Sequence, residues 1–135
     1  MKKLLIGGQA LVKLGSSRST NDTDYLVNDL STKSAFIHLE GNVDLINANG
    51  SKFFAEIWAM EINSIEFASI NALIELKAYA LVQHCLNGAF LKADEAEFDI
   101  KYLTRIGAKL PTIVKKYVSA GQYAEIVKVI KEVKF

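Results

Sequence analysis

The stretch from residue 4 to residue 27 constrains the fold of this chain more than any other part of the sequence. The short apolar run Leu4-Leu5-Ile6 is typical of a buried strand, and Gly7-Gly8 interrupts it. A short amphipathic segment and a polar loop come next. The run Asp22-Thr23-Asp24-Tyr25-Leu26-Val27 then alternates before it turns apolar, as a strand entering a core does. The order predicts a strand, a glycine turn, a short helix, a loop and a second strand.

Two aspartates open the second predicted strand. Because alternate residues of a strand point to the same face, Asp22 and Asp24 are expected to place two carboxylates side by side. Neighbouring carboxylates repel each other, and a divalent cation removes that conflict. Mg²⁺ favours one or two protein carboxylates together with phosphate oxygens and water. The pair is therefore a candidate metal site.

The residues ahead of the aspartates are suited to binding phosphate. Gly7-Gly8 before a helix lets the backbone approach a phosphate closely, with helix N–H groups directed at it. Arg18 can add a bidentate contact to the same group, and Ser17 is a further candidate in the loop. Combined with the paired carboxylates, these residues indicate a nucleoside triphosphate held with a metal ion.

The combined pattern resembles the signature of the nucleotidyltransferase superfamily. The resemblance is to its minimal and AbiEii-like (abortive-infection toxin) branch. The interval between the glycine pair and the aspartates is longer than in the polymerase-like members, and it is similar to that of the toxin-like and antibiotic-modifying branches. The residues that carry the resemblance are Gly7-Gly8-Gln9-Ala10 followed by Gly15-x-x-Arg18-x-Thr20-x-Asp22-x-Asp24.

The resemblance implies further site residues. In the family a third carboxylate comes from a neighbouring strand, in an apolar-Asp-apolar-apolar context to which Val43-Asp44-Leu45-Ile46 is similar. Asp44 is therefore the implied third metal ligand and the general base for the attacking hydroxyl. An aspartate inside an apolar run is costly to bury unless it is paired or metal-bound. Lys77 and Asp99 resemble the family's helical lysine and aspartate positions, so Lys77 is an implied nucleotide contact.

The length indicates a single domain that spans residues 1–135, and the order of the expected elements together with the resemblance implies an α/β fold. A small mixed sheet flanked by helices is expected over about residues 1–69, and a helical half over about residues 70–135. The formal net charge of +1 argues against a strongly basic nucleic-acid platform. The single cysteine, Cys85, excludes an intramolecular disulfide. No targeting or membrane-spanning segment is expected, and we predict a cytoplasmic protein.

Turn and capping residues predict the remaining elements. Gly41-Asn42 is expected to join two strands in a hairpin, and a short edge strand is expected near residues 64–69. Ser51 and Asn71 are the expected N-caps of two helices. The predicted strands of the hairpin are 34–40 and 43–48, and the predicted helices are 52–62, 72–86, 94–106, 111–118 and one from about 123 onward.

Each candidate also has an ordinary structural interpretation. The two aspartates are also good turn residues, Arg18 is also a plausible surface charge, and Asp44 fits a water-facing edge strand. Lys77 is more simply a surface lysine or the ion-pair partner of Asp99. His38 and His84 are expected to be structural or exposed.

The functional hypothesis is a metal-dependent nucleotidyltransferase. With Mg²⁺ or Mn²⁺, the enzyme would transfer a nucleoside monophosphate from an NTP to a hydroxyl and release pyrophosphate. RNA, a protein and a small molecule all remain open as the acceptor. The alternative is a non-catalytic nucleotidyltransferase-like module that acts as an antitoxin or regulatory partner. A homodimer or a complex with a partner protein is compatible with either hypothesis.

Overall fold

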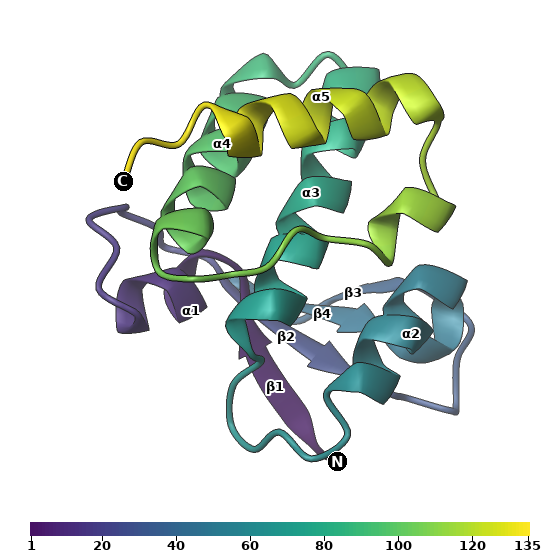
Figure 1. The fold of residues 1–135 in the computed structure, drawn as a ribbon. Helices are drawn as coiled ribbons and strands as arrows, with labels where there is room; N and C mark the ends of the chain where they lie inside the picture. The colour runs from purple at the N-terminus through teal and green to yellow at the C-terminus, as the bar shows by residue number, and fades with distance from the viewer. The chain divides into compact units, whose positions relative to one another are not determined.

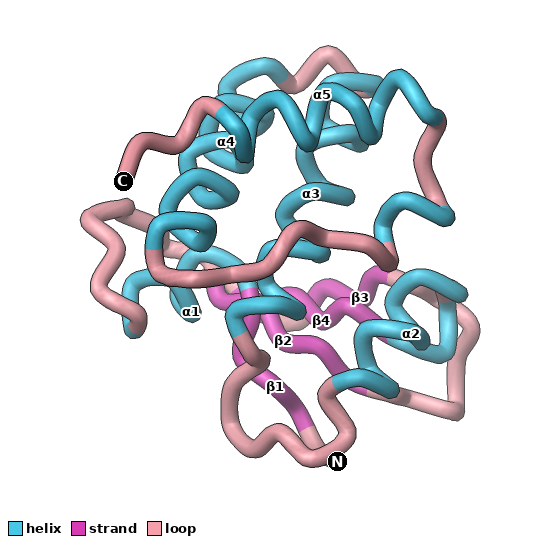
Figure 2. Tube along the Cα trace, viewed as in Figure 1, coloured by secondary structure: helices cyan, strands magenta, loops and turns pink.

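The computed structural model describes all residues from 1 to 135, and Figure 1 follows the chain through five α-helices and four strands. The chain divides into two compact units, Met1–Ala72 and Leu73–Phe135. All four strands belong to the first unit, whereas the second unit contains only helices and loops (Figure 2). The expected α/β class, with a mixed sheet and a helical C-terminal half, is therefore confirmed.

The sheet of the first unit has the strand order β1-β2-β4-β3. Strand β1 is antiparallel to β2, β2 is parallel to β4, and β4 is antiparallel to β3. The expected hairpin at Gly41-Asn42 is present, although β3 is shorter than predicted. The strands are β1 (Lys3–Ile6), β2 (Thr23–Val27), β3 (Phe36–His38) and β4 (Val43–Asn47).

Two helices of the first unit pack against the sheet. Helix α1 (Gly7–Lys13) follows β1 directly and contacts β1 and β2, with Ala10 and Leu11 buried. A 3₁₀ turn, η1 (Ala48–Gly50), leads to α2 (Lys52–Met60), which contacts β4. The Oγ atom of Ser51 accepts a hydrogen bond of 3.3 Å from the N–H of Phe54, so the predicted N-cap is confirmed.

The link between α2 and α3 (Ile70–Leu86) differs from the prediction. No strand forms at residues 64–69; a single bridge joins Phe67 to Leu5 of β1. Asn71 is not the N-cap, because α3 already begins at Ile70 and Ser69 Oγ accepts from the N–H of Ala72 at 3.3 Å. The carboxylate of the buried Glu61 accepts hydrogen bonds from the N–H and the hydroxyl of Ser69, which fixes Ser69 at the start of the helix.

The second unit contains most of α3 together with α4 (Phe90–Arg105) and α5 (Ala120–Lys131). The prediction that α4 begins at Asp94 was wrong, because the backbone turns at Gly88, with φ of +70°, and re-enters a helix at once. The carbonyl of Ala89 already accepts from the N–H of Ala93 at 2.9 Å. A glycine tolerates this left-handed conformation without a steric penalty, so a very short turn suffices between the two helices.

The predicted helix over residues 111–118 is also absent. Only the 3₁₀ turn η2 (Val114–Lys116) forms there. The buried carboxylate of Glu75 accepts hydrogen bonds from the N–H groups of Ile113 and Val114, at 2.8 and 2.9 Å. Both N–H groups therefore bind a side chain of α3. This contact between residues far apart in sequence overrides the preference of the segment after Pro111 for a helix.

Helix α5 begins before the predicted Tyr123. Ser119 and Gln122 form a capping box, in which Ser119 Oγ accepts from the N–H of Gln122 and Gln122 Oε1 accepts from the N–H of Ser119. Ile126 and Val129 are buried along the helix, as is Val133 just beyond it. Helical spacing therefore places the apolar side of α5 in the core of this unit.

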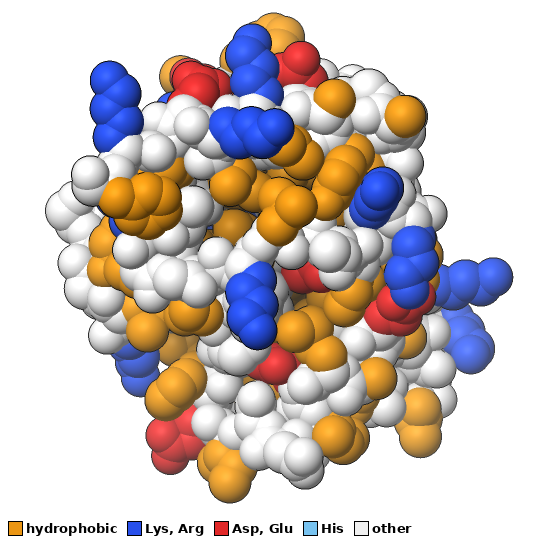
Figure 3. Space-filling view, viewed as in Figure 1, with side chains coloured by type: hydrophobic (Ala, Val, Ile, Leu, Met, Phe, Trp, Pro, Cys, Tyr) orange, Lys and Arg blue, Asp and Glu red, His pale blue; other side chains and the backbone are white.

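Some large apolar side chains remain at the surface. Hydrophobic side chains reach the surface at several separate places on the face drawn in Figure 3. Around the turn between α3 and α4, Leu86, Phe90 and Leu91 are 64%, 68% and 83% exposed. No helix of the protein combines the length and the apolar character needed to cross a membrane.

Candidate functional site

The two central aspartates lie next to each other in the sheet. Asp24 of β2 is paired with Asp44 of β4 in the parallel register, and with Ile6 of β1 on its other side. Asp44 is in turn paired with His38 of β3. Directly paired residues present their side chains on one face of a sheet, and adjacent strands lie about 4.8 Å apart. The four residues therefore form one row across the sheet, which we call the acidic row.

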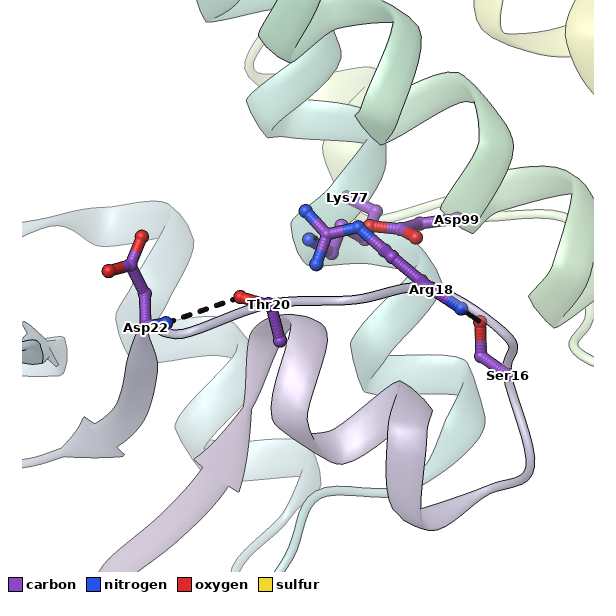
Figure 4. Close-up of polar contacts among 6 residues, drawn as sticks. All are labelled: Ser16, Arg18, Thr20, Asp22, Lys77 and Asp99. Carbon is purple, nitrogen blue, oxygen red and sulfur yellow. Dashed lines mark hydrogen bonds and ion pairs between the residues drawn. The ribbon is translucent and has the colours of Figure 1, made fainter.

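Asp22 lies just outside the sheet. It precedes β2 by one residue and is exposed, and its N–H donates to Thr20 Oγ1 at 3.3 Å (Figure 4). The next N–H, that of Thr23, donates to the carbonyl of Asn42 at 2.7 Å. The backbone on both sides of Asp22 is thus held in place, directly before the strand that carries Asp24.

The glycine turn abuts the acidic row. Gly7 has a φ of +68°, in the left-handed region that favours glycine. A Cβ atom at Gly7 would lie only 2.6 Å from Oδ2 of Asp24. Only glycine fits at this position without displacing a neighbour. The carboxylate of Asp24 therefore lies close to the backbone of residue 7, where any other residue would place its side chain.

The loop after α1 brings Arg18 back over the glycine turn. A Cβ atom at Gly8 would lie 2.0 Å from Nη1 of Arg18 and 2.8 Å from Cγ2 of Thr20. The loop is held by two hydrogen bonds: Gln9 Nε2 donates to the carbonyl of Thr20 at 3.2 Å, and the N–H of Arg18 donates to Ser16 Oγ at 3.2 Å (Figure 4). The eighteen residues from Gly7 to Asp24 therefore bring a guanidinium, a glycine pair and a carboxylate together.

The serine that supports this loop is Ser16 rather than the predicted Ser17. Ser16 is buried and accepts the hydrogen bond from the backbone of Arg18, whereas Ser17 is exposed. Nothing in the local sequence distinguishes the two serines, since both lie in the same polar run. A nucleotide contact by Ser17 stays a prediction.

The sequence alone did not reveal the contact of His38. Its Nδ1 lies 2.6 Å from Oδ1 of Asp44, and the two side chains are 68% and 48% exposed. His38 is exposed as predicted, yet it touches a candidate site residue. The predicted hairpin did not supply this signal, because a two-residue turn at Gly41-Asn42 pairs residue 39 with residue 44, whereas the observed register is shifted by one residue and pairs residue 38 with residue 44.

Lys77 is paired within the second unit. Its Nζ lies 2.9 Å from Oδ2 of Asp99, which is fully buried (both residues are drawn in Figure 4). This contact confirms the simpler interpretation, in which the lysine of α3 is the ion-pair partner of the aspartate of α4. Burial of a carboxylate demands such a partner. A contact of Lys77 with nucleotide stays a prediction.

The donor chemistry of the acidic row fits a hard divalent cation. Asp24 and Asp44 supply carboxylate oxygens from neighbouring strands, and the missing side chain of Gly7 makes room for the carboxylate of Asp24. Mg²⁺ and Mn²⁺ prefer such oxygens and complete their coordination with phosphate and water. The protein contains no group of three or more His, Cys, Asp or Glu side chains already arranged around a common metal position.

Comparison of the chain with family models, with curated proteins and with solved structures finds no match. The functional interpretation therefore depends on the residues of this chain and their geometry.

Proposed function

We propose that the protein is a metal-dependent nucleotidyltransferase, which transfers a nucleoside monophosphate from an NTP to a hydroxyl acceptor and releases pyrophosphate. The observation that supports this most is the adjacency of Asp24 and Asp44 in the parallel register, beside a glycine turn that Arg18 covers. All of these residues belong to the first unit. A carboxylate pair for metal and a guanidinium for phosphate thus occur on one small α/β scaffold.

In the proposed reaction, the hydroxyl oxygen of the acceptor attacks the α-phosphorus and the bond to the β-phosphate oxygen breaks. Asp44 accepts the proton of the attacking hydroxyl, and pyrophosphate carries away the electron pair of the broken bond. Asp22, Asp24 and Asp44 would hold Mg²⁺ or Mn²⁺, which would supply positive charge to neutralise the phosphates and the attacking and leaving oxygens.

The remaining residues bind and orient the triphosphate. Arg18 offers a planar, bidentate donor to phosphate oxygens, and its position over Gly8 places that donor beside the acidic row. The missing Cβ atoms of Gly7 and Gly8 make room for the carboxylate of Asp24 and the guanidinium of Arg18, so the glycine pair lets both proposed ligand-binding groups lie close to the backbone. Ser17 is a further proposed contact from the loop that carries Arg18.

The test is incorporation of label from each of the four α-³²P-labelled NTPs into a cell lysate, with Mg²⁺ or Mn²⁺ present. Asp24→Asn and Asp44→Asn should abolish transfer and keep the fold, because amide and carboxylate have nearly the same shape. Asp94→Asn, an exposed aspartate of α4, is the matched control and should retain transfer. Full transfer by Asp24→Asn or Asp44→Asn would refute the metal assignment.

A non-catalytic interaction module is the second candidate, and the exposed apolar side chains around the turn between α3 and α4 favour it. Leu86, Phe90 and Leu91 gather three large apolar groups on one short segment, as is common at protein interaction sites. Calorimetric titration of a non-hydrolysable NTP with and without Mn²⁺ distinguishes the two candidates. Metal-linked nucleotide binding supports the transferase, and its absence supports the module.

A further inference from the structure

We propose that His38 is a positioning residue for Asp44: its ring holds one oxygen of that carboxylate so that the other faces the metal and the acceptor hydroxyl. This role rests on the proposed function, because it assigns His38 a task in the same site. It adds a residue from the edge strand β3 to a set that otherwise comes from β2, β4 and the glycine turn.

The backbone fixes His38 opposite Asp44. The two residues are paired in the antiparallel register of β3 and β4, and the N–H of Leu39 donates to the carbonyl of Val43 at 2.9 Å on the turn side of that pair. Side chains of directly paired residues lie on the same face of the sheet. The imidazole is thus delivered to Asp44 by the hairpin itself.

The hydrogen bond determines which ring nitrogen carries a proton and which oxygen of Asp44 stays available. An ionised carboxylate only accepts hydrogen bonds, so Nδ1 of His38 is the donor at its distance of 2.6 Å from Oδ1. That contact occupies Oδ1 and leaves Oδ2 of Asp44 for other ligands.

The carboxylate of Asp44 needs a contact that fixes its orientation, because Asp24 is its neighbour on the other side. Asp24 lies beside it on β2, and two adjacent carboxylates repel each other. Without an opposing contact, Asp44 can rotate away from Asp24, since its side chain is 48% exposed and has room to move. His38 lies on the side of Asp44 away from Asp24 and anchors one oxygen there, which limits the orientations of the carboxylate. Groups that orient metal-binding carboxylates typically affect metal affinity by about 10- to 100-fold.

The experiment compares two substitutions of His38, one that keeps a hydrogen-bond donor and one that removes it. His38→Asn keeps an N–H group at the same bond separation from the backbone as Nδ1, whereas His38→Leu has similar bulk and no donor. Binding of Mn²⁺ alone is measured by calorimetry, and transfer from labelled NTP is measured separately. We expect His38→Leu to weaken Mn²⁺ binding about tenfold, and His38→Asn to stay near the wild-type protein. Thermal melts of both variants check the fold, which an exposed pair of this kind hardly stabilises.

The outcomes separate the two proposals. If the wild-type protein binds Mn²⁺ and His38→Leu binds it equally well, the positioning role is wrong and the proposed function stands. If His38→Asn is as impaired as His38→Leu, the hydrogen bond is not what matters and the positioning role is again wrong. If the wild-type protein neither binds Mn²⁺ nor transfers nucleotide, the proposed function itself fails. Weakening by His38→Leu with rescue by His38→Asn supports the assignment.

Discussion

Replacing Gly7 by alanine tests the close approach of the glycine turn to Asp24. Two penalties act on Gly7→Ala. The backbone at φ of +68° costs an L-residue about 1–2 kcal/mol. The added methyl would also lie 2.6 Å from Oδ2 of Asp24, so that the carboxylate, the turn or both must move. Forced overpacking of this kind costs about 1–3 kcal/mol. The two penalties together predict a loss of about 2–5 kcal/mol in the free energy of unfolding.

Gly41→Ala is the matched control. Gly41 has a φ of +73°, yet a Cβ atom there meets nothing within 4 Å. This variant therefore carries the backbone penalty without the collision. Both alanines also restrict the unfolded chain, by about 0.4–1 kcal/mol, and this contribution cancels in the comparison.

Urea unfolding followed by circular dichroism measures the free energies, and calorimetry measures Mn²⁺ binding. We expect Gly7→Ala to be less stable than Gly41→Ala by about 1–3 kcal/mol, and to bind Mn²⁺ more weakly, since Asp24 is displaced. Equal stability losses in the two variants, with Mn²⁺ binding unchanged in Gly7→Ala, would refute the inferred contact between the turn and the acidic row.

Two further predictions concern the fold. Asn47 is fully buried, and its amide donates to the carbonyls of Asp29, Thr32 and Ser34 while its oxygen accepts from two backbone N–H groups. Asn47→Ala should therefore cost about 2–4 kcal/mol in urea unfolding, and a loss below 1 kcal/mol would show that water replaces these bonds. Burial, with a smaller contribution from Glu75, raises the pKa of Tyr123, whose hydroxyl donates to the carbonyl of Pro111 at 2.7 Å. As the pH rises, Tyr123 loses its hydroxyl proton first in the unfolded chain, at about pH 10. The free energy of unfolding of the wild-type protein therefore falls above that pH. The fall should be shallower in Tyr123→Phe, and identical slopes in the two proteins would contradict the shift.

The parts of the fold that the sequence predicts well depend on neighbouring residues. The apolar run before Gly7-Gly8 predicts β1 and the turn into α1, Gly41-Asn42 predicts the hairpin, and Ser51 predicts the cap of α2. In each case the residues that determine the structure lie within a few positions of one another, so local rules suffice.

Two of the errors arise where the side chain of a residue outside the segment binds a backbone group. Ser69 rather than Asn71 caps α3, because the buried Glu61 holds the backbone and hydroxyl of Ser69. The segment after Pro111 does not form the predicted helix, since Glu75 binds the N–H groups of Ile113 and Val114. Neither carboxylate is adjacent in sequence to the group it binds, so no pattern within one segment reveals the contact.

For the candidate site, too, the sequence predicts some residues and misses others. The aspartates and the glycine pair were predicted from local spacing and from a resemblance. The prediction placed Asp44 on a strand next to that of Asp24, but it did not give the parallel register that pairs the two residues. His38 was missed because the observed hairpin is shifted by one residue from the register that a two-residue turn at Gly41-Asn42 implies. Counting outward from that turn places Leu39 opposite Asp44, so the sequence pattern does not reveal the contact of His38.

The single bridge between Leu5 and Phe67 has a consequence for self-association. The N–H and carbonyl of Leu5 on the outer side of β1 are used by Glu66 and Ala68, at 2.8 and 3.1 Å. The strand at the opposite border of the sheet, β3, has only three residues. Neither border offers a long row of vacant amide groups, which is the template that lets foreign strands join a sheet and start aggregation.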